Sequence, residues 1–305
     1  MSTPAITADP DPAHPVHPAA APPAMRQRQW SVLLRGTLRQ WRARIGLTIF
    51  VFMVIVALGG PLIAPDSPDQ FVTAPNSPPS SQALFGGDSL GRDVWSRFLH
   101  GGSSVLGMSV SATLLGVGLG LVVGLTAAYI GGIADEVLMR IADVFMAFPQ
   151  IVLALLLLAA FGPSVPLIIL IVGLSHAPRV ARVIRGASLQ VVERDFVKAA
   201  EAVGESRSRI IFGELLPNVT SPLLVELGLR LTYSIGLIAS INFLGVGLQP
   251  PKADWGLMIQ ENRLAVTVQP WGVLLPVLAI ALLTIGTNLL TDGFARAAIG
   301  IDRGE

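Results

Sequence analysis

The sequence contains no cysteine, and only 13% of its residues carry a charged side chain. Without cysteine the chain can form no disulfide, no thiolate nucleophile and no cysteine-ligated metal site. The scarcity of charge, together with a mean hydropathy of +0.64, excludes an ordinary soluble enzyme and indicates a protein that crosses a membrane several times. We therefore predict an all-α membrane protein.

The chain also lacks a motif for binding ATP. A phosphate-binding P-loop needs a lysine between a glycine and a serine or threonine, but Lys198 follows Val197 and Lys252 follows Pro251. Four glycines do resemble a nucleotide-binding run, yet they lie in an uncharged apolar stretch, where small residues favour close packing of helices. These are Gly116, Gly118, Gly120 and Gly124.

Groupings of catalytic or metal-binding residues are missing as well. His100 and His176 stand alone, without a serine and an aspartate in a plausible context. His14 and His17 are each followed by proline, in a stretch whose composition favours solvation over metal binding. We expect no catalytic residue, no bound metal and no cofactor in this chain, and no nucleic-acid partner.

The first 44 residues divide into two parts. Residues 1–25 are rich in proline and contain no apolar run, which predicts a disordered cytoplasmic tail rather than a signal peptide. From Arg26 to Arg44, apolar residues recur with a period of about 3.6 between arginines, which predicts an amphipathic helix on the membrane surface. A partner-binding helix is the alternative interpretation of residues 26–44.

The remainder, residues 45–305, predicts a membrane domain with six crossings. One crossing takes about 20 helical residues, and the Gly-Pro-Ser step at 162–164 divides one long apolar stretch into a third and a fourth span. Six crossings place both termini on the same side of the membrane. The predicted spans cover about 45–65, 104–129, 141–161, 166–185, 222–244 and 271–290.

The distribution of lysine and arginine predicts the orientation, because loops rich in these residues stay in the cytoplasm. With the N-terminus inside, the inner parts hold 16 of them and the outer loops hold 4, while Arg230 lies within the fifth span. We therefore expect both termini, and the polar loop at 193–217, in the cytoplasm.

The 193–217 loop, between the fourth and fifth spans, has the pattern of a bent helical knob. Good helix formers at 198–203 are followed by Gly204, a residue that commonly ends a helix in the left-handed region. A second helical piece then runs to Pro217, which favours a boundary there. This order predicts a short helix, a bend and a return to the membrane, which together offer a compact surface for a partner to bind.

The same loop resembles the EAA motif of ABC-importer permeases, which reads Glu-Ala-Ala, three residues, glycine, nine residues and Ile-x-Leu-Pro. Lys198 stands in the place of the glutamate, and Glu214 in the place of the isoleucine. The role of that glutamate is therefore not transferred to this chain. The positions that match are Ala199, Ala200, Gly204, Leu216 and Pro217.

Other stretches resemble the C-type permease subunit of dipeptide and oligopeptide importers, a group shared with nickel and glutathione systems. Residues 84–97, LFGGDSLGRDVWSR, are similar to the signature FGTDxxGRDxxSR, with Gly87 in the place of threonine. Residues 242–251, NFLGVGLQPP, and residues 288–293, NLLTDG, match at the fifth and sixth spans. The similarity covers about residues 45–303.

The resemblance implies a type I importer fold in a bacterial inner membrane, in a heterodimer with a homologous permease. Two cytoplasmic ATPases would bind ATP and Mg, and an extracytoplasmic binding protein would deliver di- or oligopeptides, or else nickel chelates or glutathione. Residues 196–213 would form the helix that couples this chain to an ATPase. The coupling candidates are Lys198, Ala199, Ala200, Glu201, Gly204, Glu205 and Pro217.

The fifth span holds four candidates for the translocation pathway. A lone arginine at mid-bilayer is costly, so Arg230 should face protein or water, and Glu226 lies one turn before it in the favourable order for an ion pair. The pair could line the pathway or form a structural bridge, and both interpretations stay open. Ser240 and Asn242, nearer the outer mouth, are the other candidates.

Two further groups of charged residues have two interpretations each. In the outer loop, Asp88, Arg92 and Asp93 could dock the binding protein or serve an outer gate, or they could cap the helix that follows. Three arginines spaced by three, which could bind lipid phosphates or an ATPase, lie at the inner end of the fourth span. They are Arg179, Arg182 and Arg185.

An ion-coupled secondary transporter is the more distant alternative. Such a carrier needs ionisable groups inside the membrane and often shows an internal repeat, whereas this sequence has one charged pair in a span and no clear repeat. A membrane scaffold without transport activity would need neither the bent inner loop nor the outer signatures. The permease interpretation explains both the bent inner loop and the outer signatures.

Overall fold

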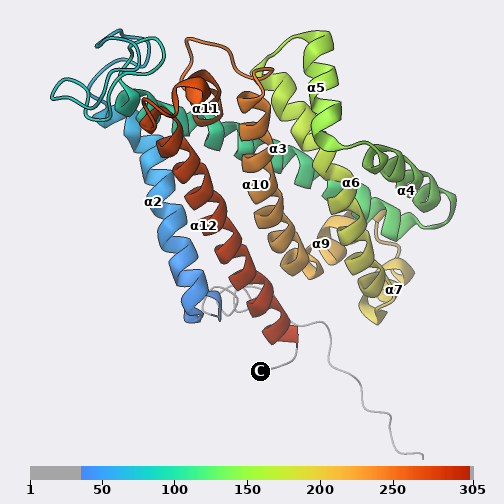
Figure 1. Cartoon of the computed structure of the whole chain (residues 1–305). Coiled ribbons are helices and arrows are strands. Elements are labelled where there is room, and N and C mark those ends of the chain that lie inside the picture. The colour runs from blue at the N-terminus through green and yellow to red at the C-terminus, as the bar shows by residue number, and fades with distance from the viewer. Residues whose placement is uncertain (1–35, 303–305) are drawn as a thin grey trace, which may run out of the picture.

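The computed structural model describes residues 36–302, in which the regular elements are helices (Figure 1). The long ones are α2 (Trp41–Ile63), α3 (Val94–Ile130), α6 (Val165–Val192), α10 (Thr220–Phe243) and α12 (Trp271–Asp302). The shorter ones are α4 (Gly132–Ala147), α5 (Gln150–Phe161), α7 (Asp195–Ala202), α8 (Arg207–Arg209), a π-helix (Ile210–Leu215), α9 (Leu216–Asn218), α11 (Trp255–Asn262) and a 3₁₀ turn (Arg263–Ala265).

The five long helices are each long and apolar enough to cross a membrane, and the bent pair α4 and α5 makes six if it counts as one span. The predicted all-α membrane fold is confirmed. Several helices run beyond the predicted spans: α3 begins at Val94 rather than near 104, and α6 continues to Val192 rather than 185. The predicted spans were limited to the apolar stretches, whereas these helices also include the polar residues at their ends.

The third predicted span, 141–161, is not one straight helix. α4 and α5 meet at an angle of 81°. Phe148 is extended, with φ −89° and ψ 133°, and Pro149 follows it. Proline disfavours the helical region for the residue before it and has no N–H to donate, so the helix breaks at this step.

The predicted disordered tail, 1–25, lies outside the described residues, as does most of the predicted surface helix, 26–44. A short helical stretch at 36–39 is described, and Gln40 then interrupts it with extended angles of φ −81° and ψ 126°. The spanning helix α2 starts at Trp41, before the predicted start at 45. Its first turns already pack closely, because a Cβ on Gly293 of α12 would lie 2.5 Å from the Cβ of Ala43.

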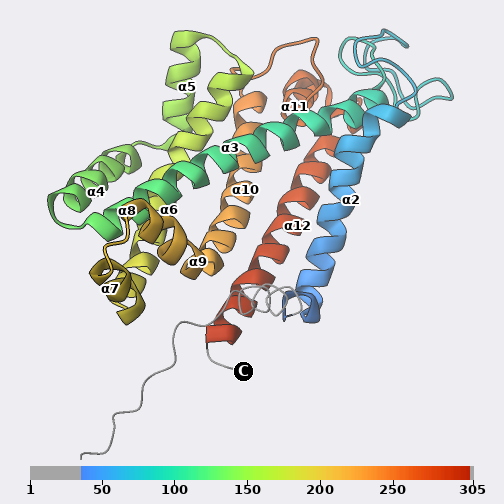
Figure 2. The same cartoon turned by 180° about the vertical axis from the view of Figure 1, so that it is seen from behind.

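The two ends of the molecule carry different elements. α2 and α12 lie side by side, and α3 runs obliquely across the bundle from the end of α2 towards α4 (Figure 2). The loop at 64–93 and α11 lie at one end, whereas α7 to α9 lie at the opposite end (Figures 1 and 2). The two sequence signatures singled out above are therefore on opposite sides of the bundle.

Close packing of α3 against α6 explains the run of glycines. A Cβ on Gly120 would lie 2.6 Å from the carbonyl oxygen of Ala177, so only glycine permits the two backbones to approach this closely. Gly116 and Gly124 meet α6 in the same way, at 2.5 Å from the carbonyl oxygen of Gly173 and 2.6 Å from that of Ala181. Gly118 has open space around it.

Gly120→Leu should therefore destabilise the protein, whereas Gly118→Leu on the same helix should not. Overpacking a tight contact typically costs about 1–3 kcal/mol, and here the added side chain would meet backbone that cannot rotate away. Unfolding in mixed detergent and SDS would measure both variants beside the parent. Equal unfolding of the two variants would contradict this account of the α3–α6 contact.

Candidate functional site

The 193–217 loop folds as the bent knob that its sequence predicts. α7 ends at a Schellman motif, in which the N–H of Glu205 donates to the carbonyl of Ala200 (3.1 Å) and that of Gly204 donates to the carbonyl of Glu201 (3.0 Å). Gly204 has φ +82°, a value in the left-handed region that L-residues avoid. After this bend come α8, the π-helix and α9, and Pro217 lies within α9 rather than at its end.

The knob is fixed by apolar residues and exposes polar ones. Val197, Ile210 and Leu215 are fully buried in a cluster with side chains of α3 and α6. At the bend, by contrast, Val203 is 84% exposed although it is apolar.

The predicted coupling residues lie on this exposed side. Glu205 and Lys198 make ion pairs within the loop region, with Arg209 (3.1 Å) and Glu193 (3.3 Å). These pairs leave the charges at the surface, where a partner can still reach them. Lys198, Ala199, Glu201 and Gly204 are exposed, and Ala200, Glu205 and Pro217 are partly buried.

Two of the arginines predicted to bind lipid phosphates are paired within the chain instead. Arg182 contacts Asp143, and Arg185 donates from Nε and Nη2 to the two carboxylate oxygens of Asp135. Two ion pairs therefore join α6 to α4. A cavity of about 610 Å³ lies between the two helices, and its three arginines face three acidic residues. The formal charges cancel, which argues against an anchor for lipid phosphates there.

The four pathway candidates on α10 are engaged within the chain. Arg230 Nε donates to Glu226 Oε2 (2.9 Å), both side chains are buried, and the guanidinium lies over the ring of Tyr233 (5.3 Å to the centroid). Ser240 donates to the carbonyl of Gly236 on its own helix (2.7 Å). The structure therefore favours the structural bridge for the charged pair.

Asn242 joins the end of α10 to the chain that follows it. Its Nδ2 donates to Asp254 (2.9 Å), and its Oδ1 accepts from the backbone N–H of Leu248 (2.9 Å). Asp254 in turn caps α11 by accepting from two backbone N–H groups. Burial raises the pKa of Asp254 in spite of these three hydrogen bonds. Asn242 is fully buried and holds this connection together, and its place in the translocation pathway stays a prediction.

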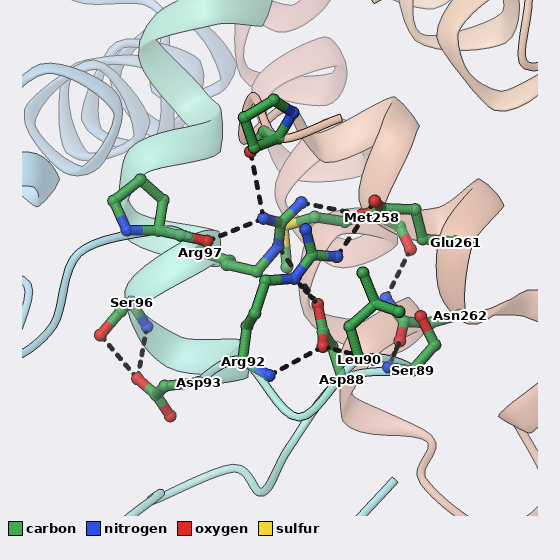
Figure 3. Close-up of polar contacts among 12 residues, drawn as sticks. Asp88, Ser89, Leu90, Arg92, Asp93, Ser96, Arg97, Met258, Glu261 and Asn262 are labelled. Carbon is green, nitrogen blue, oxygen red and sulfur yellow. Dashed lines mark hydrogen bonds and ion pairs between the residues drawn. The ribbon is translucent and has the colours of Figure 1, made fainter. Parts of the chain in front are cut away.

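Two of the residues predicted to dock a partner or serve an outer gate, Asp88 and Arg92, belong to an internal ion-pair ring (Figure 3). Arg92 contacts Asp88 (2.7 Å) and Glu261 of α11 (3.0 Å), and Arg97 contacts the same two carboxylates (3.4 and 2.8 Å). We call Asp88, Arg92, Arg97 and Glu261 the ion-pair ring. Because at most 8% of any of these side chains is exposed, they cannot form a docking surface.

Asp93 has a local role, as the alternative interpretation expected. It precedes α3, and its Oδ2 accepts from the backbone N–H of Ser96 (2.7 Å) and from that hydroxyl (2.6 Å), which is an N-terminal cap. Asn262 of α11 accepts from the backbone N–H of Ser89 (2.9 Å), which fastens the loop a second time.

Sequence reasoning missed the partners of several of these residues. Glu261 was not predicted, although two arginines in the outer parts of the chain require nearby acidic partners if they are buried. His176 was interpreted as isolated, but its Nε2 lies 3.0 Å from the hydroxyl of Ser234. No local pattern marks either contact, because the partners lie on different helices.

Arg97→Met should destabilise the protein strongly, and Arg263→Met should not. The first change leaves two buried carboxylates with one arginine, and breaking a buried ion pair costs about 3–5 kcal/mol. Arg263 is exposed at the same end of the molecule and provides a matched control. Unfolding in SDS and detergent, followed by tryptophan fluorescence, would compare them. Similar curves for both variants would contradict the structural role of the ring.

An inward-facing structure of the MetNI methionine ABC transporter matches 65% of this chain and 96% of its own, with 20% identity and a TM-score of 0.49.

Comparison of sequences identifies the family. Residues 116–299 match the model described as the binding-protein-dependent transport system inner membrane component, and residues 28–79 match the N-terminal TM domain of oligopeptide transport permease C. A putative peptide transport system permease protein of Brucella suis biovar 1 is 37% identical over 85% of this chain and 88% of its own length. The glutathione transport system permease protein GsiD of Shigella dysenteriae serotype 1 is 35% identical over 88% and 89%. This chain belongs to the family of binding-protein-dependent transport system inner membrane components.

Proposed function

We propose that this chain is the permease subunit of an ATP-driven importer for di- and oligopeptides. The family match over residues 116–299 carries the proposal, and it includes the whole bent knob of the 193–217 loop. The relative from Brucella suis is named as a peptide permease. Import of glutathione, itself a short peptide, is supported by the name of the second relative; nickel chelates are a further candidate of the same group.

The proposed seat of coupling is the 193–217 loop. Its apolar residues are anchored to α3 and α6, and its tip exposes Val203 beside the rigid turn at Gly204. A partner that displaces this tip moves α6, which leads into the loop, and α10, which follows it. Two cytoplasmic ATPases would provide that displacement and would bind ATP and Mg, while this chain itself catalyses nothing.

The proposed assembly includes a homologous permease as the second half of a heterodimer, two ATPases, an extracytoplasmic binding protein and the surrounding lipid. The excess of lysine and arginine in the termini and in the 193–217 loop supports a cytoplasmic position for these parts in a bacterial inner membrane. The 64–93 loop and α11, at the opposite end of the bundle, would then face the binding protein (Figure 1).

For Glu226 and Arg230, a structural bridge is the role that the geometry supports better than a contact with the solute. Because each neutralises the other, the pair offers no free charge to a peptide, and any contact with the solute requires a different arrangement of α10. The closed pair also gives little support to an ion-coupled carrier, which needs an ionisable group that exchanges its partner.

Purification of the assembled complex tests the proposed function. Pull-down of this chain from its native membrane should recover two P-loop ATPases and a second permease, and vesicles containing the complex and its binding protein should accumulate labelled dipeptide only when ATP is enclosed. Accumulation driven by an ion gradient after ATP depletion would contradict the proposal.

Gly204→Ala should reduce ATP-driven uptake by the complex, and Gly186→Ala in α6 should not. A left-handed backbone costs an L-residue roughly 1–2 kcal/mol. This cost lowers the population of the bent knob, relative to other conformations of the loop, by about 5- to 30-fold. Gly186 is helical and has open space around it. Uptake of labelled dipeptide and recovery of bound ATPase would be measured for both variants. Full uptake with Gly204→Ala would contradict a coupling role of the bend.

A further inference from the structure

Three polar side chains from three helices meet inside the bundle. The hydroxyl of Ser234 on α10 lies 3.0 Å from His176 Nε2 on α6 and 3.0 Å from the hydroxyl of Thr113 on α3. His176 and Ser234 are fully buried, and Thr113 is 3% exposed. The other ring nitrogen, Nδ1 of His176, has no hydrogen-bond partner within residues 36–302.

The two hydrogen bonds share the hydroxyl of Ser234. That hydroxyl has one hydrogen to donate and two lone pairs to accept with, so it can bond to both neighbours at once and donates in at most one of the two bonds. Inside a membrane no bulk water replaces a lost partner, and a buried polar group without one is costly. Displacing α10 therefore breaks both bonds, and displacing α3 or α6 alone leaves a buried polar group without its partner.

The position of this contact connects it to the 193–217 loop. α6 enters the loop at Val192 and α10 leaves it at Thr220, so the loop is attached to the two helices that His176 and Ser234 join. Ser234 also lies one turn beyond Arg230 and two beyond Glu226 on the same face of α10. The α3 side of the contact adjoins the close glycine packing, because a Cβ on Gly116 would lie 2.9 Å from the Cβ of His176.

We propose that Thr113, His176 and Ser234 form a three-helix joint that makes α6, α10 and α3 move together when the 193–217 loop is displaced. They are positioning residues for transport: they contact neither the solute nor the ATPase, and they transmit displacement between helices. The proposal rests on the proposed function, because it requires an ATPase that moves the loop. Without the joint, the loop would move while the parts of α6 and α10 farther from the loop kept their positions.

This role differs from a purely structural one in a measurable way. Loss of structure lowers the amount of complex, and hence ATP hydrolysis and uptake in the same proportion. Loss of the joint leaves hydrolysis in place and lowers the number of solute molecules moved for each ATP. Two buried hydroxyls without a hydrogen-bond partner in the described chain, Ser109 on α3 and Ser188 on α6, provide matched controls.

The experiment uses the assembled complex in vesicles, with ATP hydrolysis and uptake of labelled dipeptide measured on the same sample. Ser234→Ala and the nearly isosteric Thr113→Val should each lower uptake per ATP by about fivefold or more, the lower bound of typical coupling between sites. Ser109→Ala and Ser188→Ala should keep the parent ratio. His176→Gln, which retains a polar group near Nε2, should keep more of the ratio than His176→Leu.

The outcomes separate this inference from the proposed function. If the parent complex shows no uptake that requires ATP, the proposed function fails and the joint fails with it. If the parent transports and Thr113→Val and Ser234→Ala keep its ratio, only the joint is overturned. The joint is also overturned if hydrolysis and uptake fall together in these variants, or if the two serine controls lose the ratio to the same extent.

Discussion

The close contact between α3 and α6 is the constraint on which the other features depend. Gly116, Gly120 and Gly124 let the two backbones approach so closely that a Cβ at any of these positions would clash with a carbonyl oxygen of α6. Two consequences follow from that distance. The apolar side chains of the 193–217 loop pack into the same cluster as Val117 and Ile184, and His176 comes within reach of the polar residues of α3 and α10. A larger residue at Gly120 would separate all of these groups together.

A second theme is that the charges of the bundle are satisfied within the chain. The ion-pair ring, the pairs between α4 and α6, and the pair of Glu226 with Arg230 each combine equal numbers of positive and negative groups. The ring joins the 64–93 loop and α3 to α11, and the second group joins α6 to α4. These ion pairs help to fix the positions of the elements that they join, whereas Glu226 and Arg230 lie one turn apart on α10, where each neutralises a buried charge that would be costly alone.

The sequence predicted what depends on neighbouring residues and missed what depends on distant ones. The bend at Gly204 could be predicted because a left-handed residue is a property of the local backbone. The glycines of α3 likewise predicted a tight contact between helices. The break at Phe148 was obscured, since the long apolar run outweighed the single Pro149. The ring was beyond reach because Glu261 is separated from Arg97 by 164 positions, so the sequence left the roles of Asp88 and Arg92 open.

That separation has a consequence for the order in which the protein is made. Arg92 and Arg97 leave the ribosome long before Glu261, so during synthesis both arginines share one acidic neighbour, Asp88, while α3 to α10 are still being inserted. The ring can close only once α11 has been translated and has reached the same side of the bilayer. The ion-pair ring is thus completed late in synthesis, and a chain truncated before residue 261 leaves Arg92 and Arg97 without their second counter-ion.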